Sequence, residues 1–330
     1  MIPIRQNKAA LDKHWEMISP QILKRIKYVL KSRQISKGKG KHRKVYQLST
    51  ELENFLNTIN TTDTLKSYLH LEYDGLRCKI NWFENNLRSA IFRPSKKNQV
   101  SNDANYLILY SIFVDHGYSY ENFNKLNFIE KLNIDTCPYC NRNYIYALSK
   151  KGQIKPEIDH FFPKGIYPFL GASFYNLVPS CQTCNGFGGK GSEDTYRLDV
   201  KSPYEIKEGE FHFTFVPADL DFLNPLRAKG TIEIKLDKKH DPNADLFKLN
   251  ELYLKHEDHV LELIVKSEFE YSKEYRKKLQ DFDKYALSPE EIDRMIIGNY
   301  NRADDLQKRP LSKLYRDIAI ELGLISSSEH

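Results

Sequence analysis

Two pairs of closely spaced cysteines constrain this chain more than any other feature. Each pair encloses two residues and forty residues separate the pairs, which are Cys137 with Cys140 and Cys181 with Cys184. Thiolates at such spacing are the ligands that tetrahedral zinc prefers, and in a reducing compartment they indicate a metal site rather than disulfides. We therefore expect all four to bind one structural zinc ion, and the fifth cysteine, Cys78, to be a buried hydrophobic residue.

The segment between and just after the cysteine pairs carries polar residues suited to phosphodiester chemistry. Asp159 and His160 are adjacent, Asn176 follows them, and Asn185 directly follows the last cysteine. Carboxylate and amide oxygens are hard ligands that suit Mg²⁺, and an imidazole can act as a general base. Glu157 is either a further ligand or only a strand residue.

The order of these residues resembles that of the HNH endonuclease family, whose core is a ββα-metal fold. The resemblance covers about 55 to 70 of the 330 residues and rests on Asp159-His160, Asn176, Cys184-Asn185 and Lys190-Gly191. The chain is most similar to bacterial HNH proteins that work beside an ATPase in anti-phage defence, as in Septu and some retron systems. The resemblance thus implies a metal-dependent endonuclease with nucleic acid, expected to be DNA, as substrate and an ATPase as partner. Because the chain has no N-terminal apolar stretch of signal-peptide length, we also expect it to be cytoplasmic.

The resemblance also assigns roles to individual side chains. Asp159 and Asn185 would bind a catalytic Mg²⁺ or Mn²⁺ ion, and His160 would take a proton from the attacking water. Asn176 would hold either a loop or the His160 ring, and Lys190 would contact a phosphate beside the scissile one. In the family the Asp-His pair sits at the irregular end of a strand, which lets both side chains reach the site.

Three other interpretations of the central segment stay open at this point. One is a nucleic-acid-binding zinc module without catalysis, and another is an HNH nuclease that cleaves RNA. A third follows from Cys-Pro-Tyr-Cys, which is also the glutaredoxin active-site sequence; there it opens a helix, whereas Tyr144-Ile-Tyr favours a strand here. His256 and His259 lie one helical turn apart but do not form an HExxH motif.

Positive charge is concentrated in the first third of the chain. Residues 1–130 contain 21 Lys and Arg against 12 Asp and Glu, whereas residues 206–330 contain 20 against 25. No acidic residue lies between Met17 and Thr50. Such a stretch is expected to bind a phosphate backbone with salt-dependent affinity, although a merely solvated face is the alternative. The expected contacts are Lys37, Lys39, Lys41, Arg43 and Lys44.

Hydrophobic periodicity predicts an α+β fold dominated by helices. Helical spacing marks residues 22–30, 76–91, 106–114, 249–264 and 311–324, with Asp103 and Ser288 as N-caps. Alternation predicts paired strands at 211–215 and 232–236. In the central region we expect strands at 144–146, 156–160 and 176–178, and a helix that begins at Cys184-Asn185.

These elements suggest three regions. We expect a basic helical region over residues 1–130, an HNH nuclease core with its zinc site over 131–205, and a small sheet with helices over 206–330. No apolar stretch has the length of a signal peptide or a membrane span, so we expect no membrane association.

Overall fold

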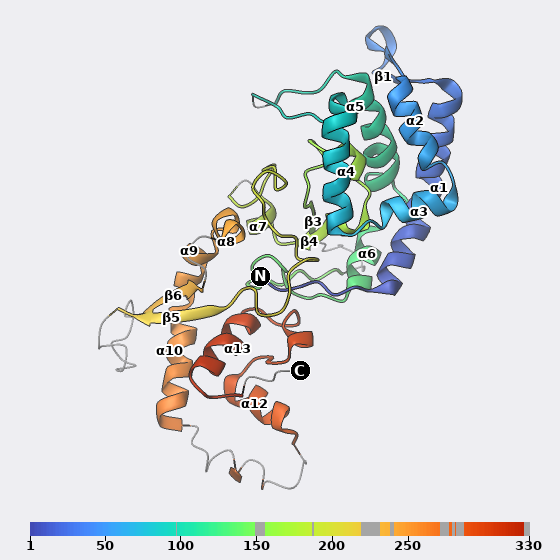
Figure 1. The fold of residues 1–330 in the computed structure, drawn as a ribbon. Coiled ribbons are helices and arrows are strands. Elements are labelled where there is room, and N and C mark those ends of the chain that lie inside the picture. Colours follow the sequence, from blue (N-terminus) through green and yellow to red (C-terminus); the bar gives the residue numbers. More distant parts are fainter. Residues whose placement is uncertain are drawn as a thin grey trace.

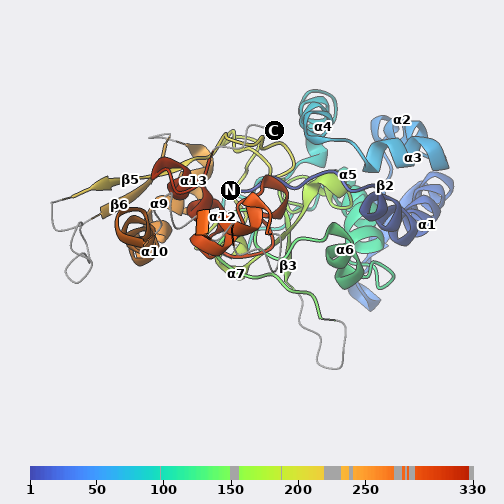
Figure 2. The ribbon, with the colours of Figure 1, turned by 90° about the horizontal axis from the view of Figure 1, so that it is seen from below.

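The fold is mixed α+β and dominated by helices, with three small two-stranded sheets. The computed structural model describes residues 1–96, 98–148, 156–186, 188–218, 232–237, 241–270, 277–278, 281 and 287–326. Figure 1 shows helices α1 to α6 at one end and β5, β6, α10, α12 and α13 at the other. Strand β3 and helix α7 lie between these groups in both views (Figures 1 and 2).

The N-terminal helices form a bundle around a continuous apolar core. They are α1 (Lys8–Ser32), α2 (Thr50–Thr58), α3 (Thr62–Leu69), α4 (Tyr73–Asn86), α5 (Ala104–Leu109), the π-helical turn η3 (Tyr110–Tyr118) and α6 (Lys125–Leu132). Ile22, Ile26 and Val29 of α1 are fully buried, as their spacing predicts. The cap is also confirmed, because the Asp103 side chain accepts from the first backbone N–H groups of α5.

Two details of this bundle differ from the prediction. Helix α4 ends at Asn86, and residues Arg88–Ala90 form a separate 3₁₀ turn, so the helix predicted for 76–91 is shorter. Cys78 is exposed rather than buried. It lies between the buried Leu76 and Ile80 on α4, and at about 100° per residue the intermediate position turns away from the core.

A basic β-hairpin follows α1. The helix ends at Ser32 because Arg33 adopts a left-handed conformation with φ of 53°. Strands β1 (Gln34–Lys37) and β2 (Lys44–Gln47) then pair antiparallel, with Lys37 opposite Lys44. The basic stretch after α1 is therefore an ordered hairpin whose tip spans residues 38–43.

The central region consists of two paired strands followed by one helical turn. Strand β3 (Glu157–His160) pairs antiparallel with β4 (Leu177–Ser180), and α7 (Gln182–Asn185) follows. The predicted strand at 144–146 is wrong, because only an isolated bridge joins Thr136 to Tyr144. The predicted helix start is also wrong: α7 ends at Asn185, where a glycine-rich segment with low helix propensity follows.

Aromatic side chains fix the loop between β3 and β4 to the N-terminal bundle. Phe169 stacks on Phe83 of α4 with 3.8 Å between ring centroids, and the Tyr68 hydroxyl donates to the Phe169 carbonyl. The Tyr73 ring of α4 stacks on Phe162 with 5.7 Å between ring centroids. These contacts hold the loop after β3, several residues of which line the cavity described below, against the N-terminal bundle.

The C-terminal region contains the predicted sheet and a series of short helices. Strands β5 (Phe213–Pro217) and β6 (Ile232–Leu236) pair antiparallel, which confirms the alternation. The helices are α8 (Pro242–Phe247), α9 (Leu249–Tyr253), α10 (Glu257–Val265), α12 (Pro289–Ile297) and α13 (Ser312–Glu321). The single long element predicted over 249–264 is wrong, because a 3₁₀ turn at Leu254–His256 separates α9 from α10. Ser288 caps α12 in a capping box with Glu291, as predicted.

None of the helices that the structure describes is both long enough and apolar enough to cross a membrane.

Candidate active site and metal centre

The four cysteines converge as their spacing predicts. One ligand atom from each lies within 4.8 Å of the others, and the group is suited to hold a metal ion such as zinc. The donors are Cys137 and Cys140 from the turn after Ile134 and Cys181 and Cys184 at the start of α7.

The first cysteine pair lies in a tight turn rather than at the start of a helix. Asn141 adopts a left-handed conformation with φ of 51°, and the Cys137 N–H donates to the Asn143 carbonyl at 2.9 Å. The Asn143 side chain donates to Cys181 Sγ at 3.3 Å. This geometry favours the metal site over a glutaredoxin-like redox pair, which would open a helix.

Asp159 and His160 reach the same cavity although they are neighbours on a strand. The cavity has a volume of about 520 Å³, and its lining also includes Asn185, Lys190 and Lys37. Side chains of adjacent strand residues point to opposite faces, but His160 is the last residue of β3, where the regular ladder ends. Both residues are almost fully buried, at 3% and 4% exposure.

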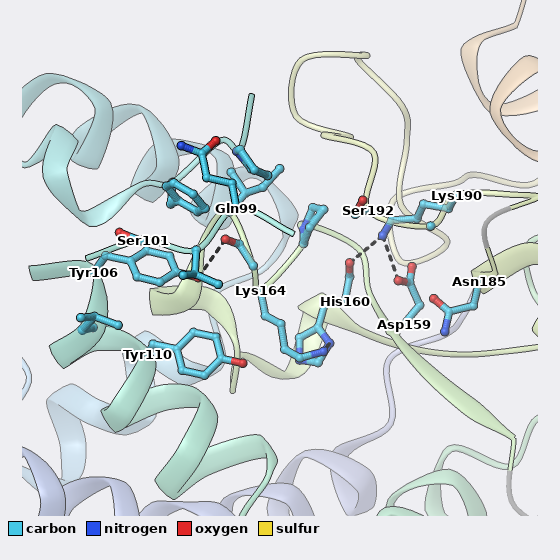
Figure 3. Close-up of a pocket in the computed structure, with 18 of the residues that line it drawn as sticks. Gln99, Ser101, Tyr106, Tyr110, Asp159, His160, Lys164, Asn185, Lys190 and Ser192 are labelled. Carbon is cyan, nitrogen blue, oxygen red and sulfur yellow. Dashed lines mark hydrogen bonds and ion pairs between the residues drawn. The ribbon is translucent and has the colours of Figure 1, made fainter. Parts of the chain in front are cut away.

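The Asp159 carboxylate is held from two sides. The Tyr139 hydroxyl donates to Oδ2 at 2.7 Å, and the Lys190 ammonium donates to Oδ1 at 2.8 Å (Figure 3). Tyr139 belongs to the Cys-Pro-Tyr-Cys turn, is fully buried and stacks on Phe247 at 4.3 Å. The Tyr139 side chain therefore links the turn of the first cysteine pair to the Asp159 carboxylate.

The His160 ring has one nitrogen bonded to the backbone and one that faces charge. Nε2 lies 3.0 Å from the Gly171 carbonyl, and because a carbonyl only accepts, Nε2 carries the proton and Nδ1 carries the lone pair, which accepts from the Lys164 ammonium. The Lys164 ammonium lies 3.5 Å from Nδ1, and the Tyr118 ring packs edge-on at 4.3 Å. Burial, reinforced by Lys164, lowers the pKa of His160 well below its usual range and keeps the ring neutral at pH 7.

Asn176 holds the loop and does not touch the His160 ring. Its Oδ1 accepts from the Phe162 N–H at 2.7 Å, and its Nδ2 donates to the carbonyls of Phe162 and Leu170, both at 3.0 Å. Gly171 follows Leu170 in this loop, and its carbonyl accepts the hydrogen bond from His160 Nε2. Only glycine fits there, because an added Cβ would lie 2.7 Å from Val114.

Asn185 lies beside Asp159 at the end of α7 (Figure 3). Its Nδ2 donates to Glu157 Oε2 at 2.7 Å, which leaves the amide oxygen as the atom able to bind a cation. Glu157 is exposed on β3 and thus acts here as the hydrogen-bond partner of Asn185.

Lys190 lines the cavity and is buried within the site. The side chain is 1% exposed, and its ammonium bridges Asp159 and the His160 carbonyl at 2.8 Å each. The glycine-rich segment folds back so closely that an added Cβ at Gly189 would lie 2.4 Å from the Cys184 carbonyl. This reversal of the chain places the Lys190 ammonium next to Asp159.

The predicted nucleic-acid contacts on the basic hairpin lie in two different places. Lys37 lines the cavity and lies 3.4 Å from Asp115 and 5.0 Å from the Tyr110 ring centroid. The other predicted contacts are exposed around the tip, and they are Lys39, Lys41, Arg43 and Lys44.

Sequence reasoning assigned no role to three residues that complete the site. Tyr139 orients Asp159, Lys164 faces His160 Nδ1, and Gly171 holds the other side of the ring. Lys164 follows His160 by four residues in the sequence, so its proximity to His160 was the available signal. His256 and His259 are engaged elsewhere, with the Arg142 side chain and the Tyr315 hydroxyl.

Comparison with known proteins gives one distant relationship. The chain is 31% identical over 113 residues to the Septu protein PtuB of Bacillus thuringiensis. The match covers 34% of this chain and 40% of PtuB, so the chain spans less than half of the length of that relative. No protein-family model and no solved structure matches this chain.

Proposed function

We propose that this protein is a metal-dependent HNH endonuclease that hydrolyses phosphodiester bonds of nucleic acid as an effector of anti-phage defence. The observation that carries the proposal is the position of His160, which lines the cavity with Nε2 fixed by the Gly171 carbonyl and Nδ1 next to the Lys164 ammonium. The two strands and one helical turn that hold Asp159, His160 and Asn185 follow the order of a ββα core. Similarity to a Septu protein supports the defence role.

The donor set beside His160 fits a hard divalent cation. Asp159 offers carboxylate oxygens that each retain acceptor capacity after one hydrogen bond, and Asn185 offers an amide oxygen. Bound to these two residues, Mg²⁺ or Mn²⁺ would neutralise charge on the phosphate and on the departing 3′ oxygen. The cysteine cluster would hold zinc with a structural role.

The chain's own residues account for the proton transfer. His160 is neutral, and its Nδ1 accepts a proton from a water molecule that attacks the phosphorus atom. The Gly171 carbonyl stabilises the imidazolium that forms, because it accepts from Nε2–H. Lys164 carries positive charge beside the same nitrogen and is placed to contact the phosphate. The products would carry 5′-phosphate and 3′-hydroxyl ends.

The test is cleavage of plasmid DNA and of RNA by the purified protein in Mg²⁺ or Mn²⁺, with and without chelator. The proposal expects metal-dependent cleavage with the stated ends. Binding of nucleic acid without any cleavage would instead support the zinc module that lacks catalysis. An ATPase partner belongs to the same proposal, and co-purification from the native host tests it.

The exposed tip of the basic hairpin should contribute to affinity without contributing to the fold. Charge reversal replaces Lys39, Lys41, Arg43 and Lys44 with Glu and removes four expected phosphate contacts. The slope of log K against log salt concentration for a duplex should then decrease in magnitude by about 3 to 4. Binding isotherms in chelator, over a range of salt concentrations, measure this slope.

A matched control reverses the same number of positive charges in another region of the chain. Four exposed lysines of the C-terminal region, reversed to Glu, should leave the salt slope close to that of the parent: Lys207, Lys255, Lys277 and Lys278. Equal effects of the two sets would mean that the hairpin acts only through net charge.

Removing the Tyr139 hydroxyl should weaken binding of the catalytic cation. Partners that orient a metal ligand typically change metal affinity by about 10- to 100-fold when mutated, so Tyr139→Phe should weaken Mn²⁺ binding by that amount. Isothermal titration of the zinc-loaded protein with Mn²⁺, without substrate, measures the change. Tyr253→Phe is the control, because the Tyr253 hydroxyl donates to the Cys140 carbonyl and is buried in the same region. Zinc content should stay unchanged in both variants, and equal Mn²⁺ affinities would show that Tyr139 does not position Asp159.

A further inference from the structure

The cavity at the candidate active site is larger than hydrolysis of a phosphodiester requires. Beyond the residues proposed for catalysis, much of the wall comes from the N-terminal region, from Lys37 and from residues between 92 and 110. A volume of about 520 Å³ falls in the range of pockets that enclose small organic ligands. A phosphate and a water molecule would leave much of this space empty.

The N-terminal part of the wall contains a group of aromatic residues, Phe92, Tyr106 and Tyr110. Tyr106 and Tyr110 have ring centroids 5.9 Å apart, and Phe92 packs edge-on against Tyr106 at 5.7 Å. The Tyr106 hydroxyl donates to the Gly165 carbonyl at 2.9 Å, which ties this wall to the loop that follows His160. In Figure 3 the Tyr110 ring points toward Lys164 and His160. An aromatic surface next to cationic side chains is the combination that single-stranded nucleic acid binds, with bases on rings and phosphates on lysines.

The depth of the catalytic residues limits the form of the substrate. Asp159 and His160 are 3% and 4% exposed, so the scissile phosphate must enter the cavity to reach them. In a duplex the bases are paired and stacked, and enzymes that need a nucleotide inside a pocket must unpair it or use a single strand. A flexible strand with an unpaired base enters without this cost.

Two lysine side chains of the cavity lie between the tip of the basic hairpin and His160. Lys164 lies beside His160, and Lys37 lies over the Tyr110 ring at 5.0 Å, where β1 joins the exposed basic tip. A strand that runs from the hairpin to His160 would therefore pass Lys37, Tyr110 and Lys164 in turn. Among the predicted contacts on the basic hairpin, Lys37 is the one that lines the cavity.

We propose that this cavity binds one unpaired nucleotide beside the scissile phosphate, with its base against Tyr110 and Tyr106 and its phosphate at Lys164. The inference rests on the proposed nuclease function and narrows its substrate to single strands and unpaired loops of nucleic acid. The aromatic side chains favour an unstacked base over one that is stacked in a duplex. Unpaired DNA and unpaired RNA both present such a base, so both fit the proposed site.

The test uses full-length His160→Ala protein, so that binding is measured without cleavage. Its ligands are an unpaired oligonucleotide and the fully paired duplex of the same sequence, each as DNA and as RNA. Both unpaired forms should bind more tightly than their duplexes, and preference for only one sugar would assign the natural source. Tyr110→Ala in this background should weaken binding of the unpaired strand by roughly 10- to 100-fold, the range of base–aromatic stacking, and change duplex binding little.

Two further variants separate the ring from other effects. Tyr110→Phe keeps the stacking surface and should bind like the parent, and Tyr144→Ala removes a half-exposed tyrosine that is not among the lining residues and should also bind like it. A measurement that needs no change at Tyr110 uses 2-aminopurine placed in turn along the unpaired strand. Its fluorescence should be quenched at one position by stacking.

The outcomes distinguish this inference from the proposed function. Cleavage of paired duplex at least as fast as of unpaired strands, with no position-specific quenching, would overturn the nucleotide site while leaving the nuclease intact. Absence of any cleavage by the parent protein, together with quenching at one position, would overturn the nuclease and leave the site as a binding pocket.

Discussion

Replacement of Cys137 with alanine is expected to release the structural metal and to unfold the central region of this protein. Structural zinc sites of this kind contribute on the order of 10 kcal/mol to folding, which equals or exceeds the net stability of a typical domain. The cysteine ligand atoms already lie within 4.8 Å of one another, and Cys137 is completely buried. Loss of one thiolate leaves the metal incompletely held and three thiols in an apolar environment.

The unfolding should extend beyond the cysteine turn because that turn joins distant parts of the chain. The Ile2 N–H donates to the Pro138 carbonyl and the Leu311 N–H donates to the Asn141 carbonyl. The Tyr253 hydroxyl donates to the Cys140 carbonyl. Metal analysis of the purified variant and hydrogen exchange across β3, β4 and α13 would measure the metal loss and its spread.

Cys78→Ala is the matched control. Its thiol is exposed on α4, so this substitution should change neither the metal content nor the melting temperature noticeably. A Cys137→Ala protein that retains stoichiometric zinc and melts with the parent would refute a zinc site built from these four cysteines.

Local patterns predicted those parts of the fold that depend on local physics. The alternation of Phe213 and Phe215 marked β5, and the caps at Asp103 and Ser288 were correct because a cap needs only residues within one turn. The strand that ends in Asp159-His160 was likewise predictable from sequence. These features require no knowledge of which distant segments pack together.

Features that depend on long-range packing were not predictable. Burial of Lys190 requires a carboxylate and a carbonyl that converge on it, and the sequence alone favours an exposed lysine. Tyr139 acts on Asp159 through a contact across twenty positions of the chain. The aromatic wall of the cavity comes from α5 and η3, which hydrophobic spacing marked only as a buried helix. Catalysis by this site stays a prediction of the resemblance.

His160→Ala is expected to remove most cleavage while leaving the fold, the zinc content and nucleic-acid binding close to normal. A positioned general base typically contributes ~10²–10⁴-fold to the rate, and the effect should be on rate rather than on affinity. Single-turnover cleavage at saturating protein measures the rate, and binding in chelator measures the affinity. The contact that this substitution breaks, to the Gly171 carbonyl, lies in a loop that Asn176 holds independently.

Substitution of the expected cation ligands should give a different pattern. Asn185→Ala should weaken the apparent affinity for Mg²⁺, and high Mg²⁺ or Mn²⁺ should partly restore cleavage, whereas neither restores His160→Ala. Asn185 is the cleaner ligand to test because it is only partly buried and its side chain, among the residues that the structure describes, bonds to the exposed Glu157. Asp159→Ala should show the same metal dependence but also a lower melting temperature. It leaves the Lys190 ammonium buried without its carboxylate, and breaking a buried ion pair typically costs about 3–5 kcal/mol.

The contrast between base and ligand decides whether the activity belongs to this cavity. If His160 is the base, its alanine variant loses rate at every metal concentration, because no cation supplies the missing Nδ1 lone pair. If Asp159 and Asn185 hold the cation, their variants lose rate at low metal and regain it as the concentration rises. Cleavage by His160→Ala at the parent rate, or cleavage that persists in chelator, would mean that the phosphodiester is hydrolysed somewhere other than at the end of β3.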